Sequence, residues 1–357
     1  MMATAEGDVI EVPGKDGQPP YKVGVIKLPS FYADNQALQA GDENAKSASH
    51  DVRKILEDFK AKGVQGVVMD LRNNGGGLLN EAIELTGLFI DEGPVVQVRD
   101  FSGRVFPYKD DFPGVAYDGP LVVLISKFSA SASEIFAGAI KDYGRGLVVG
   151  DSSTHGKGTV QKVLDLDRDI RGGFGGGGGK GLGAVKLTMQ QFYRVNGQST
   201  QNMGVPSDIV LPSPSDHEDF GEAKLDYALD SDQIPNAMYL PMGNVNKSLI
   251  AELQKLSSDR FASDPELQKL KTKKDKIHER RNRGTLVFNE TSMKKDREEF
   301  KDENEDADEL HEDGATSKDG KKKEEKKFGT DPYTNEVLRI TSDYIRLGDE
   351  HGLTANK

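Results

Sequence analysis

The chain has 357 residues, and its 59 acidic against 47 basic side chains give a formal net charge of −12. That balance argues against a general affinity for nucleic acid or for an anionic membrane surface. The sequence has no cysteine, which excludes a disulfide framework and a thiolate metal site, and we expect no cofactor or metal. No stretch approaches the roughly 20 apolar residues of a membrane-spanning helix. The first residues have neither the basic nor the apolar part of a signal peptide.

Residues 1–212 show strand-like and helix-like segments in alternation. Near-continuous apolar runs such as LVVLI are typical of strands buried on both faces, so this part predicts an α/β core. The expected strands are 21–29, 64–72, 94–100, 120–126, 146–151 and 183–197, and the expected helices are 48–63, 78–90 and 132–144.

Residues 213–357 are strongly charged and mostly helical in pattern, so they form a second predicted domain. Two or three helices are expected in 245–284, and a last helix begins at Asp331 and Pro332. The segment of about 295–327 is predicted to be mobile, because it offers almost no apolar surface to offset the entropy of ordering. The glycine run at 172–183 predicts a flexible loop between two strands.

Ser131 stands between the apolar strand 120–126 and the helix that follows it. With Glu134 three residues later it fits a capping box, which by itself explains a serine at a helix start. The same position also suits a nucleophile, because open α/β sheets carry their active sites at strand ends. The helix N-terminus supplies N–H groups for an oxyanion. The residues alone leave both interpretations open.

A serine nucleophile needs a base, and His155 and Lys157 are the nearby candidates. Lys157 is flanked by glycines, which invite close packing around its side chain. To act as a base the amine must be neutral, so burial has to lower its pKa from about 10.4 towards roughly 7–8.

Three glycines at 75–77 follow the buried strand 64–72. They are compatible with an ordinary turn, and equally with a backbone that approaches a ligand closely and points its amides into a cleft. A strand-end serine, a glycine-flanked lysine and a strand-end glycine triplet together favour a hydrolytic site.

Five motifs in order carry a specific resemblance: DLRNNGGG, FSASASEIFAGAI, DYGRGLVVG, GKGTVQ and QFYRVNGQSTQNMGVPSDIV. They resemble the carboxy-terminal processing proteases, a serine–lysine peptidase family that includes the tail-specific proteases. DPELQKL and DPYTNEVLRI resemble the helical C-terminal extension of that family, so the likeness covers most of residues 20–348. It implies a crotonase/Clp-like ββα core in 1–212, followed by a mainly α-helical extension in 213–357.

The resemblance also implies residue roles in a serine–lysine dyad. Its motif positions give the following expectations: Ser131 as nucleophile, Lys157 as base, Gln161 orienting the lysine, the amides of Gly77 and Ala132 as oxyanion donors, Asp142 and Glu134 as supporting residues, and Ser129 and Ser133 without a chemical role. For Asp142, charge pairing or capping near the helix end is an equally good explanation, and for Glu134 the expected work is the capping box.

The implied function is that of a serine endopeptidase cleaving unstructured or C-terminally marked proteins through an acyl-enzyme. The implied partners are protein or peptide substrates with exposed C-termini and an adaptor lipoprotein or a second copy of the chain, in the periplasm or cell envelope. The sequence departs from the family in three places. Nothing resembles its PDZ domain, since only about 20 residues precede strand 21–29. The loop before Lys157 is one residue longer, and the glycine run replaces a less glycine-rich loop.

The residues also bear on three other functions. A phosphate-binding loop needs a hydroxyl residue after its lysine, whereas glycine follows both Lys157 and Lys180. A hydrolase using His155 with Ser131 remains open, and replacing His155 and Lys157 separately distinguishes the two bases. A non-catalytic binding or scaffold fragment also remains open, because the recruitment domain is not visible in this chain.

Overall fold

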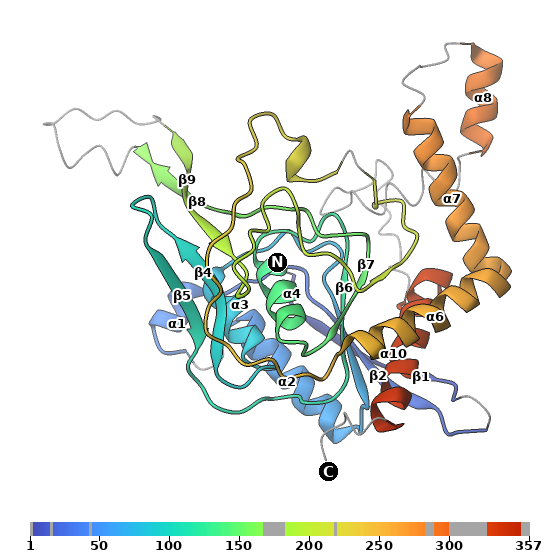
Figure 1. Ribbon diagram of the computed structural model, residues 1–357, viewed down its shortest axis with the longest axis horizontal. Helices are drawn as coiled ribbons and strands as arrows, with labels where there is room; N and C mark the ends of the chain where they lie inside the picture. The colour runs from blue at the N-terminus through green and yellow to red at the C-terminus, as the bar shows by residue number, and fades with distance from the viewer. Residues whose placement is uncertain are drawn as a thin grey trace, which may run out of the picture.

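The computed structural model describes residues 3–14, 17–42, 45–166, 183–217, 220–282, 289–299 and 327–350. The described residues form two sheets with helices packed against them (Figure 1). The strands are β1 Glu6–Val12, β2 Tyr21–Lys27, β3 Gly66–Asp70, β4 Gly93–Arg99, β5 Val105–Asp110, β6 Leu121–Ile125, β7 Leu147–Gly150, β8 Thr159–Asp165, β9 Ala184–Tyr193 and β10 Ile209–Val210. The helices are α1 Asn35–Gln39, α2 Ala48–Ala61, α3 Leu79–Thr86, α4 Ala132–Asp142, η2 Glu222–Lys224, α6 Lys247–Ser263, α7 Pro265–Asn282, α8 Glu290–Glu299 and α10 Pro332–Glu350.

The larger sheet has the strand order β1-β2-β3-β6-β7-β10, and every pair except β1–β2 is parallel. Strands β3 and β6 are buried along their whole length, as their continuous apolar sequences predict. Because β3, β6 and β7 are parallel neighbours, the loops that follow them meet at one edge of the sheet. These loops carry the glycine triplet, the serine turn and the lysine.

Helices cover both faces of this sheet, and each face has its own apolar core. On one face α2, α3 and α4 bury side chains such as Leu56, Leu85 and Phe136. On the other face α6 and α10 pack against the strands, with Leu253 and Ile340 in the second core. The expected mixed α/β fold with a helical C-terminal part is therefore confirmed.

The smaller sheet has the order β5-β4-β9-β8 and is antiparallel throughout. Its strands β8 and β9 project away from the helices (Figure 1). The alternation of its sequence predicts strand β9, whereas no pattern predicts β5 or β8. The residues 167–182 between β8 and β9, which include most of the glycine run, lie outside the described residues.

In the C-terminal part, α6, α7 and α10 occupy the segments where helices are expected. Helix α8 extends to Glu299, supported by an ion pair between Glu290 and Lys294 at 2.8 Å. Most of the segment predicted to be mobile, residues 300–326, lies outside the described residues. Within the described ranges, no helix has both the length and the apolar character needed to cross a bilayer.

Candidate active site

Ser131 lies in the turn that joins the end of β6 to the start of α4. Its backbone has φ 56° and ψ −111°, a positive φ that non-glycine residues rarely adopt. Such a conformation costs about 1–3 kcal/mol and persists only where surrounding contacts enforce it. The sequence predicts a serine at the helix start, but not this backbone conformation.

The glycine loop after β3 lies directly against this turn. A Cβ added to Gly76, whose φ is 110°, would stand 2.8 Å from the Ala130 carbonyl oxygen and from the Ser131 Cβ. Only glycine permits that approach. Among the described residues, neither the Gly77 nor the Ala132 amide donates a hydrogen bond, so both N–H groups remain available to an acceptor.

Two neighbouring serines fix the turn to the loop. The Ser129 hydroxyl donates to the Leu71 carbonyl at 2.7 Å, and the Ser133 hydroxyl donates to the Asn74 carbonyl at 2.8 Å. The Asn74 side-chain oxygen accepts from the Gly76 amide at 2.9 Å. The expectation that Ser129 and Ser133 have no chemical role is compatible with these contacts, because both hydroxyls are committed to carbonyl groups and hold backbone.

Glu134 connects the serine turn to the lysine loop. Its Oε2 accepts from the amides of Ser131 at 2.8 Å and Lys157 at 3.0 Å, and its Oε1 accepts from the Thr154 hydroxyl at 2.6 Å and the Gly156 amide at 2.7 Å. Burial raises the pKa of this fully buried carboxyl to about 7, although the four donors act in the opposite direction. The expected capping contact, in which the Ser131 amide donates to the Glu134 carboxylate, is present. The oxygen that accepts this bond, Oε2, also accepts from the Lys157 amide, so one atom binds the backbone of both residues.

Lys157 is half-buried, and its Nζ lies 3.4 Å from Oε1 of Gln161. Burial lowers the pKa of the amine, and the charge of Lys186 adds to this effect, while Glu222 and Glu134 oppose it. The net direction is downwards, which is the direction that a lysine base requires. Gln161 thus lies within reach of the amine that it is expected to orient.

His155, the other candidate base, is on the same loop. Its Nε2 lies 3.8 Å from Oε2 of Glu222, and its amide donates to the Ser129 carbonyl at 3.0 Å. Burial lowers the pKa of the imidazole, and Glu222 opposes that shift.

Asp142 lies at the far end of α4, about 16 Å from Ser131 at the helical rise per residue. Its carboxylate forms an ion pair with Arg194 and accepts from the side-chain Nδ2 of Asn196 at 2.9 Å. Both members of the ion pair are buried. This arrangement corresponds to charge pairing, and Asp142 does not reach the group of residues around Ser131.

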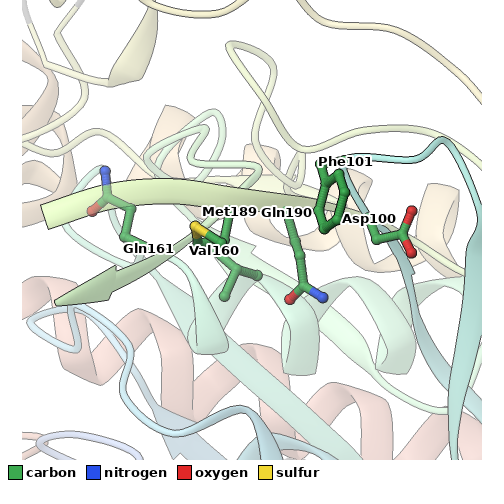
Figure 2. A pocket seen from close by; sticks show the side chains of 6 residues that line it. All are labelled: Asp100, Phe101, Val160, Gln161, Met189 and Gln190. Atoms are coloured by element: carbon green, nitrogen blue, oxygen red, sulfur yellow. The ribbon is translucent and has the colours of Figure 1, made fainter. Parts of the chain in front are cut away.

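A groove of about 490 Å³ adjoins Gln161 (Figure 2). It lies beside β8 and β9, where the register shifts: Val160 pairs with Gln190 and Gln161 pairs with Thr188, which leaves Met189 as an extra residue on β9. Such a bulge redirects side chains. The lining residues are Asp100, Phe101, Val160, Gln161, Met189 and Gln190. The sequence contains no signal for this groove, because no pattern predicts strand β8. In the described part of the chain, no group of three potential metal ligands is present.

Comparison with known proteins places this geometry in a family. Residues 22–211 match the family described as peptidase family S41, and residues 215–346 match the C-terminal domain of tail specific protease. The chain is 41% identical over 275 residues to the tail-specific protease of Haemophilus influenzae, covering 75% of this chain and 36% of that protein. It is 36% identical over 213 residues to the chloroplastic carboxyl-terminal-processing peptidase 2 of Arabidopsis thaliana, covering 59% of this chain and 36% of that protein.

A solved structure, the photosystem II D1 C-terminal processing protease, is 27% identical with a TM-score of 0.46, covering 59% of this chain and 49% of that one. The chain spans about a third of the length of the curated relatives it matches. Since the S41 match alone extends over more than half of the residues, the chain belongs to peptidase family S41.

Proposed function

We propose that the chain is the catalytic part of a serine endopeptidase in which Ser131 is the nucleophile and Lys157 the general base. The observation that carries this proposal is the shared carboxylate of Glu134, which binds the amides of both residues beside a strained, strand-end serine. Family membership supports the reaction class.

The proposed reaction begins with neutral Lys157 accepting the hydroxyl proton of Ser131 as its oxygen attacks the substrate carbonyl. The amides of Gly77 and Ala132 donate to the resulting oxyanion. Lys157 then returns the proton to the leaving amine, which breaks the peptide bond and leaves an acyl ester on Ser131. A water molecule, deprotonated by Lys157, hydrolyses that ester and regenerates the serine. Gln161 orients the lysine amine throughout.

The proposed substrate is an unfolded protein segment, with an apolar side chain in the groove beside Gln161. Phe101 is 89% exposed there, and Met189 stands at the bulge, so both present apolar surface that a substrate could cover. The names of the relatives support substrates marked at their C-termini. The resemblance extends the proposal to the periplasm or cell envelope, with an adaptor lipoprotein or self-association for recruitment.

The test is covalent labelling with a serine-directed fluorophosphonate, followed by peptide mass spectrometry, together with cleavage of an unfolded protein. We expect the adduct on Ser131, and no adduct or cleavage in Ser131→Ala. Lys157→Arg should also be inactive, because a guanidinium does not release its proton at working pH. His155→Ala should retain labelling. Labelling of another serine, or an active Lys157→Arg, contradicts the assignment.

The binding or scaffold alternative makes a different prediction. A non-catalytic fragment would show no labelling, and its affinity for unfolded chains would be the same in the wild type and in Ser131→Ala. This alternative is considered because the chain spans about a third of the length of its curated relatives.

A further inference from the structure

Arg72, in the loop between β3 and the glycine triplet, is in contact with the C-terminal segment of the chain. Its guanidinium carbon lies 5.6 Å from the centre of the Phe328 ring and 5.7 Å from that of Tyr333. Both distances are within the range of cation–π attraction. Asp70 fixes the same guanidinium through contacts of 3.0 Å to Nε and 2.7 Å to Nη2. The side chain is therefore held between a strand-end carboxylate and two rings more than 250 positions away in the sequence.

The backbone of Arg72 also holds the serine turn. Its carbonyl accepts from the Ser126 hydroxyl, and the Ser126 amide donates to the Ser129 hydroxyl oxygen at 2.9 Å. Ser129 in turn donates to the Leu71 carbonyl at 2.7 Å. A displacement of Arg72 would therefore be transmitted to the turn that carries Ser131 and to the glycine loop that carries Gly77.

On the other side of this contact, the two rings are fixed by the docking of α10. The Asp331 carboxylate accepts from the Thr334 amide at 2.9 Å, and the Thr334 hydroxyl accepts from the Gly329 amide at 3.0 Å. This compact start of α10 continues into Val337 and Ile340, both fully buried against the six-stranded sheet. The position of the rings thus depends on the helix being docked.

We propose that Phe328 and Tyr333 are positioning residues: docking of α10 places their rings against Arg72, which fixes the loop of residues 71–77 in the conformation that presents the Gly77 amide. The catalytic consequence rests on the proposed function, in which that amide binds the oxyanion. The structural coupling between α10, Arg72 and the loop of residues 71–77 does not depend on the proposed function. The C-terminal segment then contributes to the active site without touching substrate.

The experiment compares the full chain with a variant carrying Phe328→Leu and Tyr333→Leu, which keeps apolar volume but removes both rings. Hydrogen exchange is measured at the amides of Asn74, Gly76 and Leu78, each of which donates within or next to this loop. Losing the two cation–π contacts should accelerate exchange at these amides by roughly tenfold. A comparable fall in kcat, with KM within about twofold of wild type, is expected for a peptide substrate, because the loop acts in the transition state.

Two control variants separate this effect from general destabilisation. Tyr333→Phe keeps the ring and should behave as wild type. Phe261→Leu removes an aromatic ring that packs against the same second core but is not one of the two rings stacked on Arg72, and it should lower the melting temperature without changing exchange in the loop. If the double variant also weakens the packing of α10, hydrogen exchange in the loop, kcat and KM are compared for the single Tyr333→Leu variant instead.

Unchanged exchange at all three amides in the ring-free variants overturns the coupling. The same loss in Phe261→Leu as in the double variant also overturns it, since the effect would then be general. Faster exchange without any change in kcat supports the coupling and contradicts instead the oxyanion role assigned to the Gly77 amide in the proposed function.

Discussion

At Lys157, two influences that lower the pKa of the amine compete with two that raise it. Burial and the charge of Lys186 lower the pKa, whereas Glu222 and Glu134 raise it. In the proposed mechanism Lys157 acts as a base only when neutral, so we expect activity above this pKa and its loss as the pH falls through it. Because the pKa is below its ordinary value, the acidic limb of kcat/KM should lie below the range of a free lysine.

Two substitutions should move that limb in opposite directions. Lys186→Ala removes a repelling charge and should raise the pKa of Lys157, which shifts the limb to higher pH. Glu222→Gln removes an attracting charge and should shift it to lower pH. Lys294→Ala, an exposed cation on α8, serves as the control and should leave the profile unchanged. Shifts in the same direction, or none, would contradict lysine as the group that limits the rate at low pH.

The groove beside Gln161 is predicted to bind an apolar side chain of the substrate. Phe101→Ser and Met189→Ser should each raise KM for peptides with a large apolar side chain, by roughly tenfold, since burying such a side chain stabilises by about 1.5–3 kcal/mol. Peptides with alanine at the same position should be little affected. Phe112, 75% exposed and outside the groove, provides the matched control Phe112→Ser. Equal effects on both peptide series would exclude the groove as a side-chain site.

The sequence identifies Ser131, Lys157 and Gln161 as candidates, but not what holds them together. Glu134 is predicted as a capping residue because its partner Ser131 is only three positions away. Its other donors come from residues 154–157, and that contact depends on β6 and β7 being neighbours in the sheet. Arg72 likewise gives no local signal, because its aromatic neighbours come from the other end of the chain.

A buried cluster of ion pairs joins helix α6 to helix α10. Arg260 on α6 lies 2.8 Å from Oε1 of Glu336 and 2.5 Å from Oδ2 of Asp343 on α10, and Ser257 donates to Glu336 at 2.7 Å. Glu336 is fully buried. Removing one partner of such a cluster leaves a buried charge without full compensation.

We therefore expect Glu336→Ala to lower the free energy of unfolding by about 3–5 kcal/mol. Asp259→Ala on α6 breaks an exposed pair with Lys255 at 2.9 Å and should change it by less than about 1 kcal/mol. Urea unfolding followed by circular dichroism measures both. Equal small losses would show that the buried cluster does not stabilise the contact between α6 and α10.

Elements with continuous apolar runs, such as β3 and β6, could be predicted because burial on both faces leaves that pattern. Strand β5 lacks it: five of its six residues are exposed and it contains Pro107, so only its pairing with β4 makes it a strand. Helix α8 is equally hard to predict, because its charged sequence has no apolar periodicity.

In the whole molecule, the six-stranded sheet has a core on each face, and the strands and the C-terminal helices build the second core together. Val23, Val68 and Val122 on the strands meet Leu253 of α6 and Ile340 of α10 there. A chain ending before α10 would expose part of this apolar sheet face to water. The C-terminal part is thus a component of the folded core, packed on the sheet face opposite to α2, α3 and α4.

Severing the connection to α10 tests this arrangement. A specific protease site inserted within residues 300–326 separates residues 327–357 covalently from the rest, and the fragment should remain bound during gel filtration in native buffer. Six side chains of α10 are buried in the second core, Val337, Leu338, Ile340, Tyr344, Ile345 and Leu347. Each fully buried aliphatic or aromatic side chain stabilises by about 1.5–3 kcal/mol. The summed stabilisation exceeds the lower estimates of the free energy that is lost when two separate chains associate. The cut variant carrying Ile340→Asp, which puts a charge into that core, should release the fragment. If the cut wild-type fragment elutes separately, α10 is held only by its covalent connection and cannot fix the loop at Arg72.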